Sequence, residues 1–169
     1  YWEEAQKAIS KKINKNLFIK THDCMATISN NIFTSEKYTK SFIYVVRDPR
    51  SVAVSYSHHT GYDIDKTISY LISKNYIINY AKEEKTVPEL VSSWNIHYNS
   101  WKNFTKKGHG IIIKYEDLVN NPVDEFTKIL LFLKNFIQFE INEEKIIESV
   151  KSIQLKNLKK LEKKLGFKE

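Results

Sequence analysis

Three short segments of the sequence carry side chains that can bind anions or move protons. The first is Lys20-Thr21-His22, at the end of the apolar run 17–20. A histidine has an ordinary pKa of about 6.5, so it can act as a base near neutral pH. A lysine can neutralise charge on a group that is being transferred. Taken alone, the same three residues are also typical of an ordinary polar loop.

The second segment runs from Arg47 to Ser55 and follows the apolar run 42–46. Asp48-Pro49 is suited to turn the chain into a helix, because proline fits the first helical turn. A guanidinium and a hydroxyl near a helix N-terminus form a phosphate site by combining charge with oriented N–H donors. The alternative is that Arg47 pairs with a carboxylate such as Asp48 and that Ser55 bonds back to its own helix.

The third segment, Tyr115-Glu116-Asp117, follows the apolar run 111–113. Paired carboxylates can do acid–base work or bind Mg²⁺, but neighbouring ones point in different directions. Helix capping or ion pairing is therefore favoured. The sequence shows no cluster of metal-ligating residues, and its single cysteine, Cys24, excludes an internal disulfide and a cysteine-based zinc site. We expect no metal.

The elements that must position these segments are strands alternating with helices. The apolar runs 17–20, 42–46 and 111–113 predict strands covered on both faces. Helices are predicted over residues 1–12, 49–58, 63–75, 88–104, from 122 onward, 142–150 and 155–165. This alternation predicts an α/β fold, a three-layer α/β/α arrangement around a parallel sheet. Ligands of such sheets bind outside the carboxyl ends of the strands, where the first two segments are expected.

Composition sets wider limits on function. The chain has 169 residues, 41% of them hydrophobic, which suffices for one domain with a real core. No apolar run approaches the roughly 20 residues of a membrane span, so none is expected. The net charge is +7, from 27 Lys and Arg against 20 Asp and Glu. This charge indicates either an anionic ligand or a solvated lysine surface. Arginine occurs only at Arg47 and Arg50, and arginine is the residue suited to bidentate phosphate recognition.

The three segments, in this order, resemble the cytosolic-type sulfotransferases that use 3′-phosphoadenosine 5′-phosphosulfate (PAPS). Two further stretches add to the resemblance. Ser93-Trp94, with His97 and Trp101, resembles the helix that follows the family's variable substrate loops, and Asn121-Pro122 follows the Tyr-Glu-Asp segment as in the family. The resemblance covers nearly the whole chain, and the ordered set is far more specific than any one motif.

The resemblance implies a role for each residue. His22 would be the general base that takes the acceptor's proton, and Lys20 would stabilise charge on the bridging oxygen of the donor. Arg47 and Ser55 would hold the 3′-phosphate of PAPS, and Tyr115 would lie against the adenine. The reaction would transfer a sulfuryl group from PAPS to a hydroxyl or amine and leave PAP, without a metal, on a P-loop NTPase-like fold.

The sequence also departs from the family pattern. The family has an N-terminal strand and a phosphosulfate-binding loop with a Ser-Gly-Thr core, and none of the four glycines lies in such a setting. The C-terminal Arg-Lys-Gly segment is absent, and Ile153 and Leu155 would offer the adenine only apolar contact. We therefore interpret residues 1–169 as a partial sulfotransferase domain, incomplete at the N-terminus and at the C-terminus. We expect this part alone to be inactive.

The same residues also allow a second function and limit the expected partners. A non-catalytic nucleotide- or anion-binding module would keep Arg47 and Ser55 without depending on His22. Nucleic acid is not an expected partner, because the basic residues of the tail alternate with acids and an apolar face. The acceptor would be a small molecule, a glycan or a lipid, chosen by a variable loop region over residues 60–87. A cytoplasmic location is expected, and the oligomeric state is open.

Overall fold

The structure is a computed structural model that describes residues 2–13, 15–78, 87–106, 109–153, 157, 158 and 163. The chain divides into two compact units, Tyr1–Ile112 and Ile113–Glu169, and each is described by itself. Lys20, His22, Arg47 and Ser55 lie in the first unit, whereas Tyr115 lies in the second.

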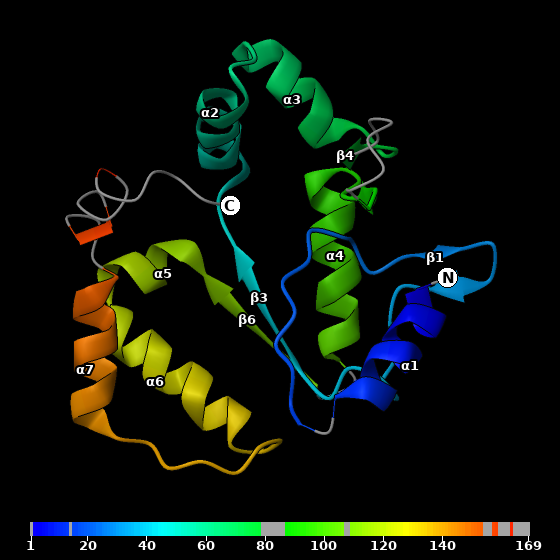
Figure 1. Ribbon diagram of the computed structural model, residues 1–169. Helices are drawn as coiled ribbons and strands as arrows, with labels where there is room; N and C mark the ends of the chain where they lie inside the picture. The colour runs from blue at the N-terminus through cyan, green and yellow to red at the C-terminus, as the bar shows by residue number, and fades with distance from the viewer. Residues whose placement is uncertain are drawn as a thin grey trace. The chain divides into compact units, whose positions relative to one another are not determined.

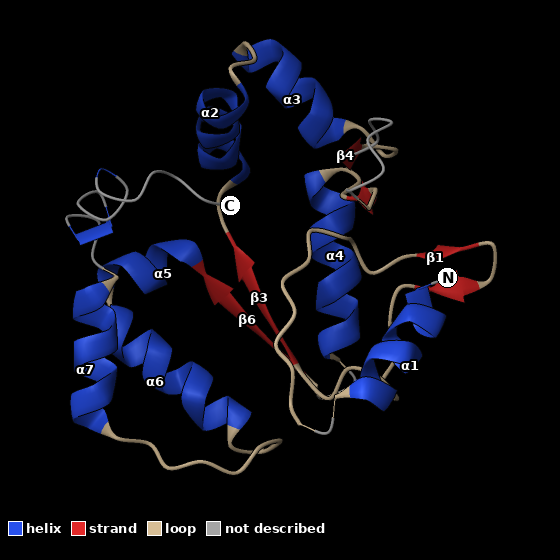
Figure 2. Ribbon diagram, viewed as in Figure 1, coloured by secondary structure: helices blue, strands red, loops and turns tan. Residues whose placement is uncertain are grey.

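Strands β3 (Phe42–Val46) and β6 (Gly110–Lys114) form a two-stranded parallel sheet (Figure 2). Both coincide with predicted strands, because runs of branched and aromatic residues suit a pleated surface that is covered by helices. At the start of the pair, the backbone N–H of Phe42 donates to the carbonyl of His109 over 3.0 Å. The fold class is therefore α/β, as predicted.

The predicted strand over residues 17–20 is wrong. These residues belong to no helix or strand, and the side chains of Leu17, Phe18 and Ile19 are 49%, 69% and 63% exposed. A strand is stabilised by hydrogen bonds to a neighbouring strand, and no strand among the described residues pairs with this run. Apolar, β-branched composition alone does not supply that partner.

A short hairpin follows, with β1 (Thr27–Ile28) antiparallel to β2 (Asn31–Ile32). Its two turn residues, Ser29 and Asn30, both have positive φ, +48° and +64°. This is the backbone of a two-residue type I′ turn, which suits the twist of a hairpin. Helix α1 (Trp2–Lys12) packs beside this hairpin (Figure 1).

Helices α2 (Pro49–Thr60) and α3 (Ile64–Ile72) contact each other and begin at aspartate caps. The Asp48 carboxylate accepts from the N–H of Arg50 over 2.9 Å, and Asp63 accepts from the N–H of Lys66 over 2.7 Å. Each carboxylate satisfies a backbone donor that has no partner inside its helix. Gly61 ends α2 with φ of +71°, a left-handed conformation that glycine adopts without strain.

Strands β4 (Ile77–Ile78) and β5 (Glu89–Leu90) are antiparallel, and helix α4 (Trp94–Thr105) follows them. The predicted helix 88–104 therefore begins later, because residues 89 and 90 pair as a strand and Ser93 caps the helix. Trp101 and Phe104 on α4 are buried. The Phe42 ring of β3 lies 4.8 Å from the ring of Trp101 and is stacked 5.4 Å from that of Phe104.

The second unit consists mainly of helices α5 (Tyr115–Asn120), α6 (Pro122–Leu133) and α7 (Glu143–Ser152). Helices α6 and α7 begin where Asn121-Pro122 and Asn142 predict, and the Asn142 side chain accepts from the N–H of Lys145. Helix α5 was not predicted. The expected tail helix over 155–165 lies largely outside the described residues, as does Leu155.

Candidate functional site

The segment from Arg47 to Ser55 forms an open pocket of about 430 Å³ at the end of β3 and the first turns of α2. Its lining side chains are those of Arg47, Arg50, Ser51, Val54 and Ser55. The pocket therefore lies among two arginines, two serines and a valine at the N-terminal end of a helix. Arginine side chains and helix N-termini bind phosphate in proteins.

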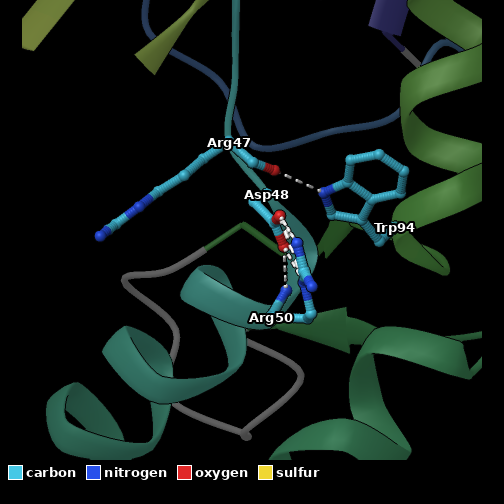
Figure 3. A network of polar contacts seen from close by, with 4 residues as sticks. All are labelled: Arg47, Asp48, Arg50 and Trp94. Atoms are coloured by element: carbon cyan, nitrogen blue, oxygen red, sulfur yellow. Dashed lines mark hydrogen bonds and ion pairs between the residues drawn. The ribbon is translucent and has the colours of Figure 1, made fainter. Parts of the chain in front are cut away.

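The two arginines of this pocket differ in their surroundings. Figure 3 shows the Arg50 guanidinium against the Asp48 carboxylate, with Nη2 2.5 Å from Oδ2 and Nε 3.0 Å from Oδ1. Hydrogen bonds from the Arg50 side chain and backbone lower the pKa of Asp48 to about 2. In the same view, the Arg47 side chain extends away from this pair. The Arg50 side chain therefore contacts Asp48, the residue that caps α2, whereas the Arg47 side chain points away from Asp48.

The backbone of Arg47 is held by helix α4. The indole N–H of Trp94 donates to the Arg47 carbonyl over 3.2 Å (Figure 3). The Trp94 ring is in turn stacked on that of Tyr98, with centroids 5.5 Å apart. The peptide from which the Arg47 side chain departs is thus tied to the first residue of this helix.

Lys20 and His22 have exposed side chains and lie in a loop rather than at a strand end. The backbone of this loop is held by hydrogen bonds at His22. The N–H of His22 donates to Oε1 of Glu89 over 3.2 Å, and its carbonyl accepts from Nε2 of His97 over 3.2 Å. The imidazole of His22 is thus open to solvent while its peptide groups are fixed on both sides.

His97 links this loop to strand β3. Its Nδ1 lies 2.9 Å from the hydroxyl of Tyr44, and the two rings are stacked with centroids 5.6 Å apart. Burial lowers the pKa of His97 and so favours the neutral ring. Burial, together with the nearby Tyr98, raises the pKa of Tyr44 to about 12. Both groups are therefore neutral near pH 7.

The residues that follow His22 are anchored by α4 and β5. The indole N–H of Trp101 donates to the carbonyl of Asp23 over 3.0 Å, and the hydroxyl of Ser100 accepts from the N–H of Met25. The Asp23 carboxylate accepts from the N–H of Leu90 over 2.7 Å, and burial raises its pKa. Asp23 and Cys24 are almost fully buried, at 6% and 2% exposure. These hydrogen bonds therefore hold the loop against α4 and β5.

The structure brings the backbones of two predicted site residues, His22 and Arg47, to the same helix. Ser55 lies in the pocket with Arg47, and its side chain is exposed. Tyr115 is the first residue of α5 in the second unit and is 40% exposed. Among the residues that might contact adenine, Ile153 is 61% exposed, and Leu155 lies outside the described residues.

Sequence reasoning assigned no role at the site to Trp94, His97 or Glu89 as anchors. The sequence favours His97 and Trp101 as core or supporting residues of their helix, and the spacing of three between Trp94 and His97 places these two on one helix face. That spacing was the available signal. Glu89 gave none, because its contact with His22 joins residues 67 positions apart.

Two kinds of feature are absent from the described ranges. Within them, no helix is both long and apolar enough to cross a bilayer. Across the same residues, no three or more His, Cys, Asp or Glu side chains are grouped as metal ligands.

Comparisons with known proteins agree with one another. The family model described as "Sulfotransferase domain" matches residues 3–165. The chain is 26% identical over 146 residues to luciferin sulfotransferase of Photinus pyralis, a match that covers 84% of this chain and 35% of that protein. It is also similar in structure to the mouse sulfotransferase SULT7A1 complexed with PAP, with a TM-score of 0.55 and 20% identity.

The structural match covers 70% of this chain and 40% of that one, so the chain spans well under half the length of these relatives. The likeness shows the fold, which is α/β with a parallel sheet and P-loop NTPase-like, as the sequence predicted.

Proposed function

The chain belongs to the sulfotransferase family, and on that premise we propose that its protein transfers a sulfuryl group from PAPS to a hydroxyl or amine acceptor. One observation carries the proposal. A cationic pocket at the start of α2 and an exposed histidine are both tied, through the peptides of Arg47 and His22, to the first turns of α4. The reaction requires a donor site and a base that are held in a fixed geometry, and contacts to one helix can provide this.

The proposed ligand of this pocket is the donor's 3′-phosphate. Arg47 offers a planar guanidinium and Ser55 a hydroxyl, and both residues line the pocket beside the first turns of α2. We assign Arg47 and Ser55 to the phosphate on this basis. Tyr115 is proposed to lie against the adenine, by resemblance to the family's Tyr-Glu-Asp segment.

His22 and Lys20 are proposed to do the chemistry. PAPS supplies the sulfuryl group and leaves as PAP. His22, with its imidazole exposed, takes the proton from the acceptor's hydroxyl or amine. Lys20 stabilises the negative charge that develops on the leaving oxygen. Positioning and electrostatics then account for most of the rate, as in phosphoryl transfer.

The acceptor is proposed to bind near residues 60–87. The described part of this region contains α3 and is rich in tyrosine rings. Tyr70 is stacked on Tyr76 with centroids 4.5 Å apart, and Tyr62 lies 5.8 Å from Tyr70. The Tyr76 hydroxyl is 2.6 Å from that of Tyr56 on α2. Such rings can line an acceptor site for a small molecule, a glycan or a lipid in the cytoplasm.

The decisive test uses variants of the full-length gene product at two positions, Arg47 and His22. Calorimetry measures PAP affinity, and sulfate transfer is assayed from PAPS to a panel of phenols, amines and sugars. Arg47→Ala is expected to weaken PAP binding by about 2 kcal/mol, roughly thirtyfold, because a charge-assisted contact is lost. Arg47→Lys should lose less, since it keeps the charge but not the planar fork.

His22→Ala is the variant at the second position and separates two classes of protein. An enzyme loses its transfer rate while its PAP affinity stays the same. A non-catalytic nucleotide- or anion-binding module shows no transfer before or after the change and binds PAP equally well. Unchanged PAP affinity in Arg47→Ala would remove Arg47 from the site.

A further inference from the structure

Two side chains on the first turn of α4 donate hydrogen bonds to two distant backbone carbonyls. Trp94 Nε1 lies 3.2 Å from the Arg47 carbonyl, and His97 Nε2 lies 3.2 Å from the His22 carbonyl. Residues three apart on a helix are neighbours on one face, roughly 5–6 Å apart at Cβ. The peptides of the proposed base and of the proposed phosphate-binding arginine are therefore tied to adjacent positions of one rigid element.

The hydrogen-bond roles of His97 follow from its partners. A carbonyl oxygen only accepts, so Nε2 of His97 must carry the proton that binds the His22 carbonyl. In the neutral ring Nδ1 then accepts from the Tyr44 hydroxyl. Tyr44 lies on β3, the strand that leads directly to Arg47. The chain of contacts thus runs from β3 through His97 to His22.

We propose that the first turn of α4 is the template that sets the spacing between the general base and the phosphate-binding arginine. His97, supported by Tyr44, positions His22, and Trp94 positions Arg47. This inference rests on the proposed function and adds positioning residues that act on the reaction without touching either substrate.

The physical need for such a template is clear at His22. Its side chain is exposed, so no packing selects the direction of the imidazole. That direction follows instead from the backbone conformation, which limits the available rotamers. Glu89 holds the N–H of His22 and His97 holds its carbonyl. Releasing the carbonyl frees one of the two constraints, and a misplacement of about 1 Å can cost a hundredfold in rate.

The test uses the full-length gene product and variants that remove single hydrogen bonds. His97→Phe keeps a ring on Tyr44 but loses the donor, and we expect kcat to fall about 10- to 100-fold with KM for PAPS and PAP affinity within twofold. His97→Gln, whose Nε2 can still donate, should recover most of kcat. Tyr44→Phe keeps the stacked ring and should lower kcat by less than His97→Phe.

Trp94→Phe tests the contact between the template and Arg47. It keeps an aromatic ring over Tyr98 and loses only the N–H to Arg47, so PAP affinity should weaken about three- to tenfold. The matched control is Asn95→Ala on the same turn, whose exposed side chain accepts from Asn99. This control should leave kcat and PAP affinity unchanged.

A measurement without turnover checks the geometry directly. Nitrogen NMR of wild-type protein at pH 7.5 should show His97 as the neutral ring with its proton on Nε2. A proton on Nδ1 instead would overturn the template, because Nε2 could not then bind the His22 carbonyl. Unchanged kcat in His97→Phe, alongside lost activity in His22→Ala, would also overturn it while leaving the proposed function intact. If His22→Ala retains the wild-type transfer rate, His22 is not the base and the template is overturned; if the wild-type protein neither binds PAP nor transfers sulfate, the proposed function itself is wrong.

Discussion

Arg47 and Arg50 are three residues apart and line one pocket, but their side chains make different contacts. The Asp48 carboxylate caps α2 and pairs with Arg50, so this aspartate and this arginine organise the first turn of the helix. The pairing keeps Asp48 ionised far below neutral pH, since its pKa falls to about 2. Arg50 thus has a structural role at the helix cap, and anion binding by Arg47 stays a prediction.

His97 also makes stability depend on pH at the residue scale. Its pKa in the folded protein is lowered, chiefly by burial, whereas an unfolded histidine titrates near its ordinary value of about 6.5. Below that value the unfolded chain binds a proton that the folded chain resists. The stabilising contribution of neutral His97 is therefore complete above about pH 6.5 and is lost as the pH falls below it.

We predict that His97→Gln reduces the loss of stability between pH 7.5 and pH 5. Glutamine keeps a donor for the His22 carbonyl but cannot take up a proton in this range. Thermal unfolding midpoints of wild type and variant, measured at several pH values, provide the test. His58→Gln, at an exposed position of α2, is the matched control. Identical pH slopes for wild type and His97→Gln would contradict the prediction.

At the scale of elements, β3 and β6 approach closely because one of them begins with glycine. A Cβ added to Gly110 would lie 2.1 Å from Cζ of Phe42. The Phe42 ring cannot simply move aside, because it packs on Trp101 and Phe104 of α4. Gly110 therefore makes room for the aromatic core that supports the start of the sheet.

We expect Gly110→Ala to destabilise the protein by about 1–3 kcal/mol, the usual cost of overpacking a core. Adding Phe42→Leu should cancel part of this cost, since the smaller side chain vacates the space. Urea unfolding of the two single variants and the double variant measures the coupling. The control is Gly61→Ala, whose new Cβ meets nothing within 4 Å and should show no coupling to Phe42→Leu. A neutral Gly110→Ala would refute the close approach.

At the scale of the whole molecule, the resemblance to the family raises the question of the donor's phosphosulfate group. The family binds the donor's phosphosulfate with a Ser-Gly-Thr loop, and that tripeptide does not occur in residues 1–169. These residues also span only 35% and 40% of the two relatives. These residues contain the pocket at α2 and the proposed base but not the family's Ser-Gly-Thr tripeptide.

We therefore predict that residues 1–169, expressed alone, transfer little or no sulfate from PAPS. Transfer of radiolabelled sulfate, compared with the full-length gene product at equal concentration, is the measurement. The His22→Ala form of the isolated chain sets the background. Turnover approaching that of the full-length product would show that the loop is dispensable.

Features set by near neighbours in the chain could be predicted from the sequence. The strand 42–46 and the helix starts at Asp48-Pro49 and Asn142 depend on residue types within a few positions, and the structure has them where predicted. The family followed from ordered motifs for the same reason. The roles of Lys20, His22, Arg47, Ser55 and Tyr115 remain predictions.

Only the tertiary structure decided what depends on distant partners. The run 17–20 is apolar, but no strand in the described part of the chain pairs with it, and it is not a strand. The bonds from α4 to Arg47 and to His22 join residues 47 and 75 positions apart. No local pattern encodes such contacts, because they form only when helices and strands pack. The sequence thus determines which groups can do the chemistry, and packing decides which helix holds them.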